Sequence, residues 1–265
     1  MSVLKQIYGV EHDGTVRAIV VEEDGHLVTT PLAVHASHKG ELFRIEKYFG
    51  EVADNASVTL LLTLGATNDV HLGELTAVVD GVWELQGFVG AETTADGTAL
   101  PAPVDINAFT ANTSDVTATH TPTLVSTTVD AASAAGQKVL NVTATTGFVV
   151  GGWVRLDDGE ITSLAAPASN NEMAQVASIQ AGVSLTMESN LVNAYTNEAV
   201  IAIGCQTLDA HTEGGTKSAS VGALADVGND IWKSGDKVIL RATNRGGAAK
   251  RLSVSLTWHE HAKQT

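Results

Sequence analysis

Residues 251–258 read Arg251-Leu-Ser-Val-Ser-Leu-Thr-Trp258, and this stretch decides the fold class. Apolar side chains alternate in it with hydroxyl-bearing ones. Because successive side chains of a β-strand point to opposite faces, this period predicts a strand with one buried side and one solvent-facing side. Strands of this kind are typical of antiparallel sheets that pack against a second layer. The segment therefore predicts an all-β fold of stacked sheets.

The same extended pattern recurs on the N-terminal side of this strand. The segments that show it are residues 42–49, 57–64, 72–79, 82–89 and 237–244. Asp80-Gly81 separates two of them and indicates a hairpin turn, because glycine adopts positive φ at no steric cost. These segments predict a jelly-roll-like β-sandwich that is formed by residues 32–126 together with residues 206–265.

Two further parts of the chain have a different pattern. Residues 127–205 hold short apolar runs separated by Gly- and Asn-rich turns, which predicts a small β-barrel-like module inserted into the sandwich. Loop tips accept such insertions because their two ends lie close together. Residues 1–31 contain two short apolar runs around Asp24-Gly25 and are too few to hold a core. We expect an N-terminal arm or hairpin that docks on a partner.

Composition excludes several classes of function. The chain has 265 residues and a formal charge of −15, with 15 basic and 30 acidic side chains. A nucleic-acid groove needs clustered Lys and Arg, and an anionic membrane surface attracts basic segments, so neither partner is expected. No apolar run approaches the ~20 residues that span a bilayer. The single cysteine, Cys205, excludes an internal disulfide framework, and the N-terminus lacks a signal-peptide pattern.

Four histidines are the best candidates for a metal site. His35 and His38 lie three residues apart, and His259 and His261 would point to the same side of a strand. The two pairs would meet if the first and last sandwich strands were neighbours. Local packing of histidines at strand ends is the alternative. It is favoured because no cysteine partner and no Glu-x-x-His helix accompanies them.

No other residue set carries recognisable chemistry, so we expect no catalytic residue, no cofactor and no enzymatic activity. Acidic clusters at 22–24 and 157–160 fit turns better than calcium or glycosidase sites. Residues 214–218 lack the spacing of a phosphate loop. Cys205 has no catalytic signature and is expected to be a buried structural thiol. The tryptophans are expected in the core, with stacking on a sugar as the alternative; they are Trp83, Trp153, Trp232 and Trp258.

Several stretches resemble a group of capsid-associated β-sandwich proteins of tailed bacteriophages, of the decoration or head-fibre kind. The resemblance covers about 150 residues, and the insert is similar to a small β module of phage structural proteins. The stretches that carry it are His35-Ala-Ser-His-Lys-Gly-Glu-Leu-Phe43, the Leu-rich run after Asn55, the hairpin at Asp80, Thr119-His-Thr-Pro-Thr123, residues 238–249 and residues 252–261.

This resemblance implies a virion structural protein that binds the outer capsid surface after synthesis in the host cytoplasm. Its implied partners are the major capsid protein and further copies of itself. A trimer is favoured, because residues 251–258 would leave a bare sheet edge if they formed a terminal strand. The alternative function is a receptor- or carbohydrate-binding module of a tail or fibre.

Overall fold

The computed structural model describes residues 7–10, 16–19, 42–106, 112–157, 172–196, 199–212, 219–221 and 231–262. Every regular element among them is a strand, which confirms the all-β prediction. In this part of the chain, no helix is long and apolar enough to cross a membrane.

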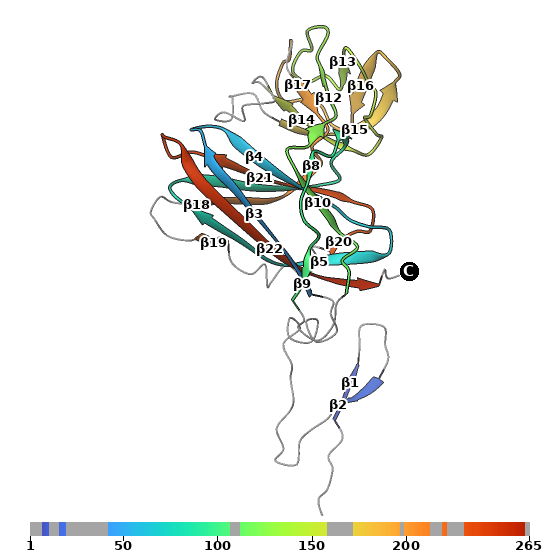
Figure 1. Ribbon diagram of the computed structural model, residues 1–265. Coiled ribbons are helices and arrows are strands. Elements are labelled where there is room, and N and C mark those ends of the chain that lie inside the picture. Colours follow the sequence, from blue (N-terminus) through green and yellow to red (C-terminus); the bar gives the residue numbers. More distant parts are fainter. Residues whose placement is uncertain are drawn as a thin grey trace, which may run out of the picture.

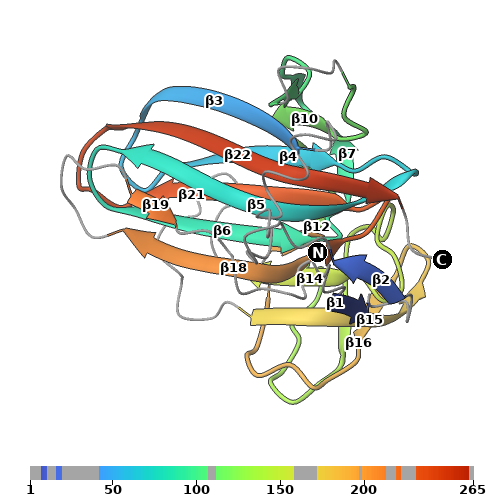
Figure 2. The same ribbon diagram turned by 90° about the horizontal axis from the view of Figure 1, so that it is seen from below.

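Two antiparallel sheets form a β-sandwich with jelly-roll strand order. In the first sheet, the order β19-β5-β22-β3 places the last strand of the chain between two early ones; in the second, the order β18-β6-β21-β4 repeats this nesting. Figure 2 shows the two layers one above the other. The strands are β3 (Leu42–Val52), β4 (Ser57–Thr63), β5 (Asn68–Val79), β6 (Trp83–Val89), β18 (Cys205–Thr212), β19 (Ala219–Val221), β21 (Lys237–Asn244) and β22 (Lys250–Ala262).

Strand β22 shows the predicted alternation but not the predicted position. Its apolar residues from Leu252 to Trp258 are buried, whereas Ser253, Ser255 and Thr257 are half-buried on the other side. The strand pairs with β3 along one edge and with β5 along the other. The expectation that it leaves a bare sheet edge is therefore wrong, and the argument for a trimer that rested on this edge is lost.

The main core fills the space between the two sheets. Leu60 and Leu62 of β4 point into it, together with the fully buried indoles of Trp83 and Trp258. Leu61, between them, faces the opposite side of the sheet and is also 0% exposed. Strand β4 is thus buried on both faces, which explains why three consecutive leucines occur in it.

The long connection after β6 adds strands to one side of both sheets. Strands β10 (Thr117–His120) and β8 (Thr98–Ala99) extend the second sheet beyond β4. Strand β9 (Val104–Asp105) pairs with β3 in the first sheet. At the opposite edge of that sheet, β20 (Ile231–Trp232), from a later part of the chain, pairs with β5. Strands β7 (Thr93–Ala95) and β11 (Thr123–Leu124) pair with each other. The connection after β6 therefore covers part of the sheet edges that β3 and β4 would otherwise leave open.

The inserted segment forms a separate six-stranded sheet with the order β12-β17-β14-β15-β16-β13. Val129 and Val142 form a bridge between the two end strands, flanked by backbone bonds from Asp130 N to Asn141 O (2.8 Å) and Thr143 N to Thr128 O (3.0 Å). The sheet therefore curls into a small barrel around its own core. Its strands are β12 (Ser126–Thr128), β13 (Val139–Asn141), β14 (Trp153–Asp157), β15 (Glu172–Gln180), β16 (Ser184–Met187) and β17 (Ala199–Ile201).

The barrel packs against the outer face of the second sheet (Figure 1). We call this contact the barrel–sandwich interface. Its members are Leu61, Phe88, Ala91, Ile201, Ile203 and Ile239, with Leu124 and Met173 packed against them. The interface is a third apolar cluster, distinct from the cores of the two parts. Whether residues 127–205 fold alone stays a prediction.

The described part of the N-terminal arm is a hairpin. Strand β1 (Ile7–Val10) pairs with β2 (Val16–Ile19), and the two make a sheet of their own. The hairpin expected around Asp24-Gly25 lies outside the described residues. A two-stranded hairpin alone is marginally stable in water, so this element is consistent with an arm that needs a partner.

Candidate binding surfaces and a histidine pair

A pair of stacked imidazoles lies at one end of the first sheet. His71 of β5 and His259 of β22 are direct cross-strand neighbours. Their ring centroids are 4.5 Å apart and their planes differ by 11°. Both side chains are half-buried. In antiparallel strands, directly opposite Cβ atoms lie about 4.5–5.5 Å apart, so the ladder itself sets this approach.

The structure changes the predicted grouping of histidines. His35 and His38 lie outside the described residues, so their expected meeting with the last strand stays a prediction. His261 follows two positions after His259 and has Asp69 opposite it in the ladder. The neighbour of His259 is His71, which the sequence analysis did not single out. Among the described residues, no group of three or more His, Cys, Asp or Glu side chains could hold a metal ion.

The other candidate residues fall into structural positions. Trp83, Trp232 and Trp258 are buried in the main core, and Trp153 is half-buried at the start of β14. Cys205 is a free thiol and half-buried, so the expectation of full burial is wrong. It lies at the start of β18, where the chain returns from the barrel to the sandwich. Asp157 ends β14, and the rest of its acidic cluster, the cluster at 22–24 and residues 214–218 are outside the described residues.

A buried carboxylate joins three segments beside the histidine pair. Glu260 is 3% exposed, and its Oε1 accepts hydrogen bonds from Trp258 Nε1 (3.0 Å) and Ser114 Oγ. Its Oε2 accepts from Asp115 N (2.9 Å) and Asn68 Nδ2 (3.2 Å). All four partners are hydrogen-bond donors to the two carboxyl oxygens, so Glu260 is a structural anchor and not an exposed acid.

A second polar cluster fixes the turn between β20 and β21. Asp69 is buried, and its Oδ1 accepts from Ser234 N (2.9 Å), while Asp236 Oδ2 accepts from Lys233 N (3.1 Å). Burial raises the pKa of the Asp236 carboxyl, and the nearby charge of Asp69 acts in the same direction. The hydrogen bond from Lys233 N and the charge of Lys233 oppose this shift.

The outer face of the first sheet carries exposed apolar side chains among small polar ones. Tyr48 of β3 is 60% exposed and Val78 of β5 is 52% exposed, and Ser253 of β22 lies between them in the ladder. Further along the face, Arg44 Nε donates to Ser255 Oγ (3.0 Å), and Arg44 also pairs with Glu46. The result is a broad surface of mixed chemistry, which suits contact with another protein.

Beside this face runs a groove of about 340 Å³, bounded by β3 and by residues 101–104. It combines a charged wall with an apolar one. Its lining residues are Arg44, Ile45, Glu46, Pro101, Ala102 and Val104. Val104 is among the most exposed apolar side chains of the described chain.

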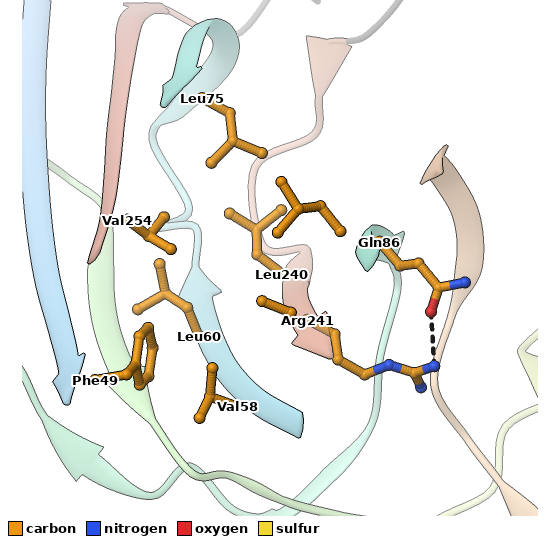
Figure 3. Close-up of a pocket in the computed structure, with 10 residues that line it drawn as sticks. Phe49, Val58, Leu60, Leu75, Gln86, Leu240, Arg241 and Val254 are labelled. Atoms are coloured by element: carbon orange, nitrogen blue, oxygen red, sulfur yellow. Dashed lines mark hydrogen bonds between the residues drawn. The ribbon is translucent and has the colours of Figure 1, made fainter. Parts of the chain in front are cut away.

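The sandwich interior holds a cavity of only about 20 Å³ (Figure 3). Leu60, Leu75, Leu240 and Val254 point toward it, so its lining is almost wholly apolar. Arg241, beside it, turns to the outer face, where its Nη2 donates to Gln86 Oε1 (2.6 Å). Small-molecule sites usually measure about 300–1,000 Å³, so this cavity is a packing defect and not a ligand site.

Comparisons with known proteins do not assign this chain to a family. No protein-family model matches the sequence, and no curated protein matches it. The structure aligns with a chain of a solved structure titled "Structure of infectious bursal disease virus Gx strain", over 84% of this chain and 81% of that one. The identity is 8% and the TM-score is 0.19. A score this low does not establish a shared fold.

Proposed function

We propose that this chain is a structural protein of a virus particle that binds the outer surface of a tailed-phage capsid and performs no catalytic step. The observation that carries the proposal is a jelly-roll sandwich whose broad outer face carries exposed apolar side chains. Jelly rolls serve as viral capsid and lectin domains, but a fold alone does not define a function. The surface chemistry therefore has to support the proposal.

Two features of the first sheet support a protein partner. Tyr48 and Val78 offer apolar anchors on a wide face, and interfaces are enriched in tyrosine relative to other surfaces. The groove beside β3 has a mixed charged and apolar lining, which suits contact with a segment of a partner chain. A charge of −15 favours approach to basic patches on a capsid.

Self-association into a trimer remains part of the proposal, on different grounds from the lost edge of β22. Among the described strands, β18 ends the second sheet and is eight residues long. Long edge strands tend to pair or to be covered. The N-terminal hairpin is a second element for which a partner is expected. Sedimentation of the purified chain at micromolar concentration distinguishes a trimer from a monomer.

The experiment that tests the function is binding to capsids assembled from the major capsid protein of the same virus. The full chain should co-sediment with these particles, and a chain lacking residues 1–31 should remain folded but bind more weakly. Val104→Asp, which places a charge in the groove, should also weaken binding; Val192→Asp, on an exposed barrel position, serves as its control. If the chain does not bind these capsids but is retained on a glycan array, the carbohydrate-binding alternative is favoured instead.

A further inference from the structure

Strand β3 is paired along only part of one of its edges. On one side it pairs with β22 from Leu42 to Val52, but on the other side β9 faces only Phe43 and Arg44. Among the described strands, none pairs with residues 45–52 of β3 on that second side. We call this stretch the open edge of β3.

The open edge exists because the chain leaves it for the other sheet. Leu100 N donates to Ala118 O (2.9 Å) in the second sheet, whereas β9 begins at Val104 in the first. The chain therefore crosses between the sheets over residues 101–103. Two of these three residues are proline, which lacks the N–H group that a sheet ladder needs. The crossing segment thus does not continue the ladder along β3.

The backbone of β3 presents hydrogen-bonding groups to this open edge. Leu42 O accepts from Ile106 N (3.0 Å) on the side of β9. In an antiparallel ladder every second residue turns its N–H and C=O to the same side, so Glu46 and Tyr48 also face that side. The regular alternation ends at the register shift that follows Tyr48. Two donors and two acceptors therefore face the position of a further strand.

The groove of about 340 Å³ lies at this position. Residues 44–46 of β3 form one wall, and Pro101, Ala102 and Val104 form the other. A strand that is added to a sheet lies about 4.8 Å from its neighbour, and so would run beside Glu46 in this groove. In recognition by strand addition, backbone hydrogen bonds give affinity and the adjacent side chains give selectivity.

The N-terminal hairpin is an element of this chain that lacks a sheet to join. Among the described strands, β1 and β2 pair only with each other, so each has one edge without a partner. A third strand would stabilise a hairpin that is marginal alone. Residues 20–41 connect the hairpin to β3 and span at most about 75 Å when fully extended. This length is enough to reach a neighbouring copy.

We propose that the β1–β2 hairpin of one copy adds to the open edge of β3 in a second copy, within the groove beside residues 101–104. This inference rests on the self-association in the proposed function and names the two segments that would make the contact. Each copy donates one hairpin and accepts one. The contact is therefore head-to-tail and can close into a ring such as the proposed trimer.

Photo-cross-linking of the purified chain at micromolar concentration identifies the occupant of the groove. Tyr48 is replaced by p-benzoylphenylalanine, an aromatic residue that retains the backbone N–H. Irradiation should give a product with the mass of two chains, and mass spectrometry should locate the cross-link within residues 1–31 of the second chain. Cross-links within a single chain, cross-links to other segments, or no cross-link would each overturn the proposal.

Two proline substitutions test the role of the backbone. Glu46→Pro removes an N–H of the open edge, where a folded sheet tolerates proline, and should lower the cross-link yield by about tenfold. Asp209→Pro is the matched control at the edge of β18. Gly90 N donates to Lys237 O (2.9 Å), so by alternation Gln86 also bonds to β21. Asp209 lies opposite Gln86, and its own N–H therefore faces the outer edge of β18.

Both variants lose one carboxylate and one N–H at a sheet edge, and circular dichroism verifies that each is folded. Asp209→Pro should retain the yield of the parent chain, and equal yields from the two variants would contradict docking at β3. Because no capsid is present, a chain that forms the cross-link but does not co-sediment with capsids supports this inference and contradicts the proposed function. Co-sedimentation without the cross-link has the opposite meaning.

Discussion

The indole nitrogen of Trp258 donates a 3.0 Å hydrogen bond to the carboxylate of Glu260, two residues further along the same strand. Both side chains lie on the buried side of β22. The bond satisfies an indole N–H that would otherwise be buried at a cost of about 1–3 kcal/mol. It also positions the carboxylate to accept from Asp115 N and Asn68 Nδ2. A single acidic residue thus connects the last strand to two earlier segments.

The first prediction is that Glu260→Gln destabilises the fold by about 3 kcal/mol. Glutamine retains one acceptor oxygen, but its NH₂ group replaces the other. Two of the four donors therefore face a donor and lose their hydrogen bond. Urea denaturation monitored by tryptophan fluorescence measures the loss. Glu51→Gln is the control, because that carboxylate is exposed in a surface pair with Arg251, and its change should stay within about 0.5 kcal/mol. Equal stability of the two variants would contradict the assigned role of Glu260.

The second prediction concerns Gly65, where a side chain would collide with Asp115. A Cβ built on Gly65 would lie 2.0 Å from Asp115 Cγ, whose carboxylate accepts from Thr67 N (2.9 Å) and Asn68 N (3.3 Å). Gly65→Ala should therefore cost about 2–3 kcal/mol through overpacking and loss of these bonds. Thermal denaturation measures the effect.

Two comparisons make the Gly65 prediction specific. Gly50→Ala introduces a methyl with no atom within 4 Å, so only its positive φ of 72° matters and the cost should be about 1 kcal/mol. In the double variant Gly65→Ala/Asp115→Ala the collision is absent, so the two losses should be less than additive. Full additivity would show that the collision is not the cause.

Sequence patterns predict the local structure of this protein well and its long-range pairing poorly. Alternation in β22 correctly indicates which side chains are buried, because it depends only on the two-residue period. No local pattern states that β22 lies between β3 and β5, so the predicted bare edge is wrong. The second buried face of β4, which carries Leu61, depends on a barrel that packs there. The burial of Glu260 depends on donors as far as 192 residues away.

The histidine pair shows the same limit. His259 and His261 were recognisable as a metal-binding pattern because they are neighbours in the sequence. His71 is 188 positions before His259 (259 − 71) and becomes its neighbour only through the ladder between β5 and β22. The sequence signal available was a histidine at the start of an extended segment. That signal gains meaning only once the strand order is known.

The third prediction is that Ile201→Ser uncouples the barrel from the sandwich. Ile201 lies at the barrel–sandwich interface, whereas its neighbour Val200 points into the barrel core. Loss of this apolar contact should lower the free energy that holds the barrel to the sandwich by about 2–3 kcal/mol. Both cores should remain intact. Differential scanning calorimetry should show one transition for wild type and two for the variant.

Val192→Ser is the matched control for the interface, since Val192 is the most exposed large apolar side chain described in the barrel. It should unfold as wild type does. Deletion of residues 127–205 with a short Gly-Ser bridge extends the test. The sandwich should still fold but expose Leu61, Phe88 and Ile239, and so aggregate more readily. A soluble deletion variant with unchanged stability would show that the interface contributes nothing.

The last prediction uses the raised pKa of Asp236. Burial is the main cause of this shift, reinforced by the charge of Asp69. A carboxyl whose pKa is higher in the folded chain binds its proton more tightly there than in the unfolded chain. The contribution of Asp236 to the free energy of unfolding is therefore most favourable below 3.8, the pKa of the carboxyl in the unfolded chain. This contribution is lost as the pH rises through the higher pKa of the folded chain. At neutral pH the ionised carboxylate destabilises the fold.

Asp236→Asn removes this charge while its side-chain oxygen can still accept from Lys233 N. The variant should be more stable than wild type at pH 7, and its advantage should shrink as the pH falls toward 3.8, where wild-type Asp236 becomes protonated. Urea denaturation of both proteins across this range gives the difference, in which acid effects common to both cancel. Asp54→Asn, at a surface turn, is the control. An advantage that is constant with pH would show that ionisation of Asp236 is not its source.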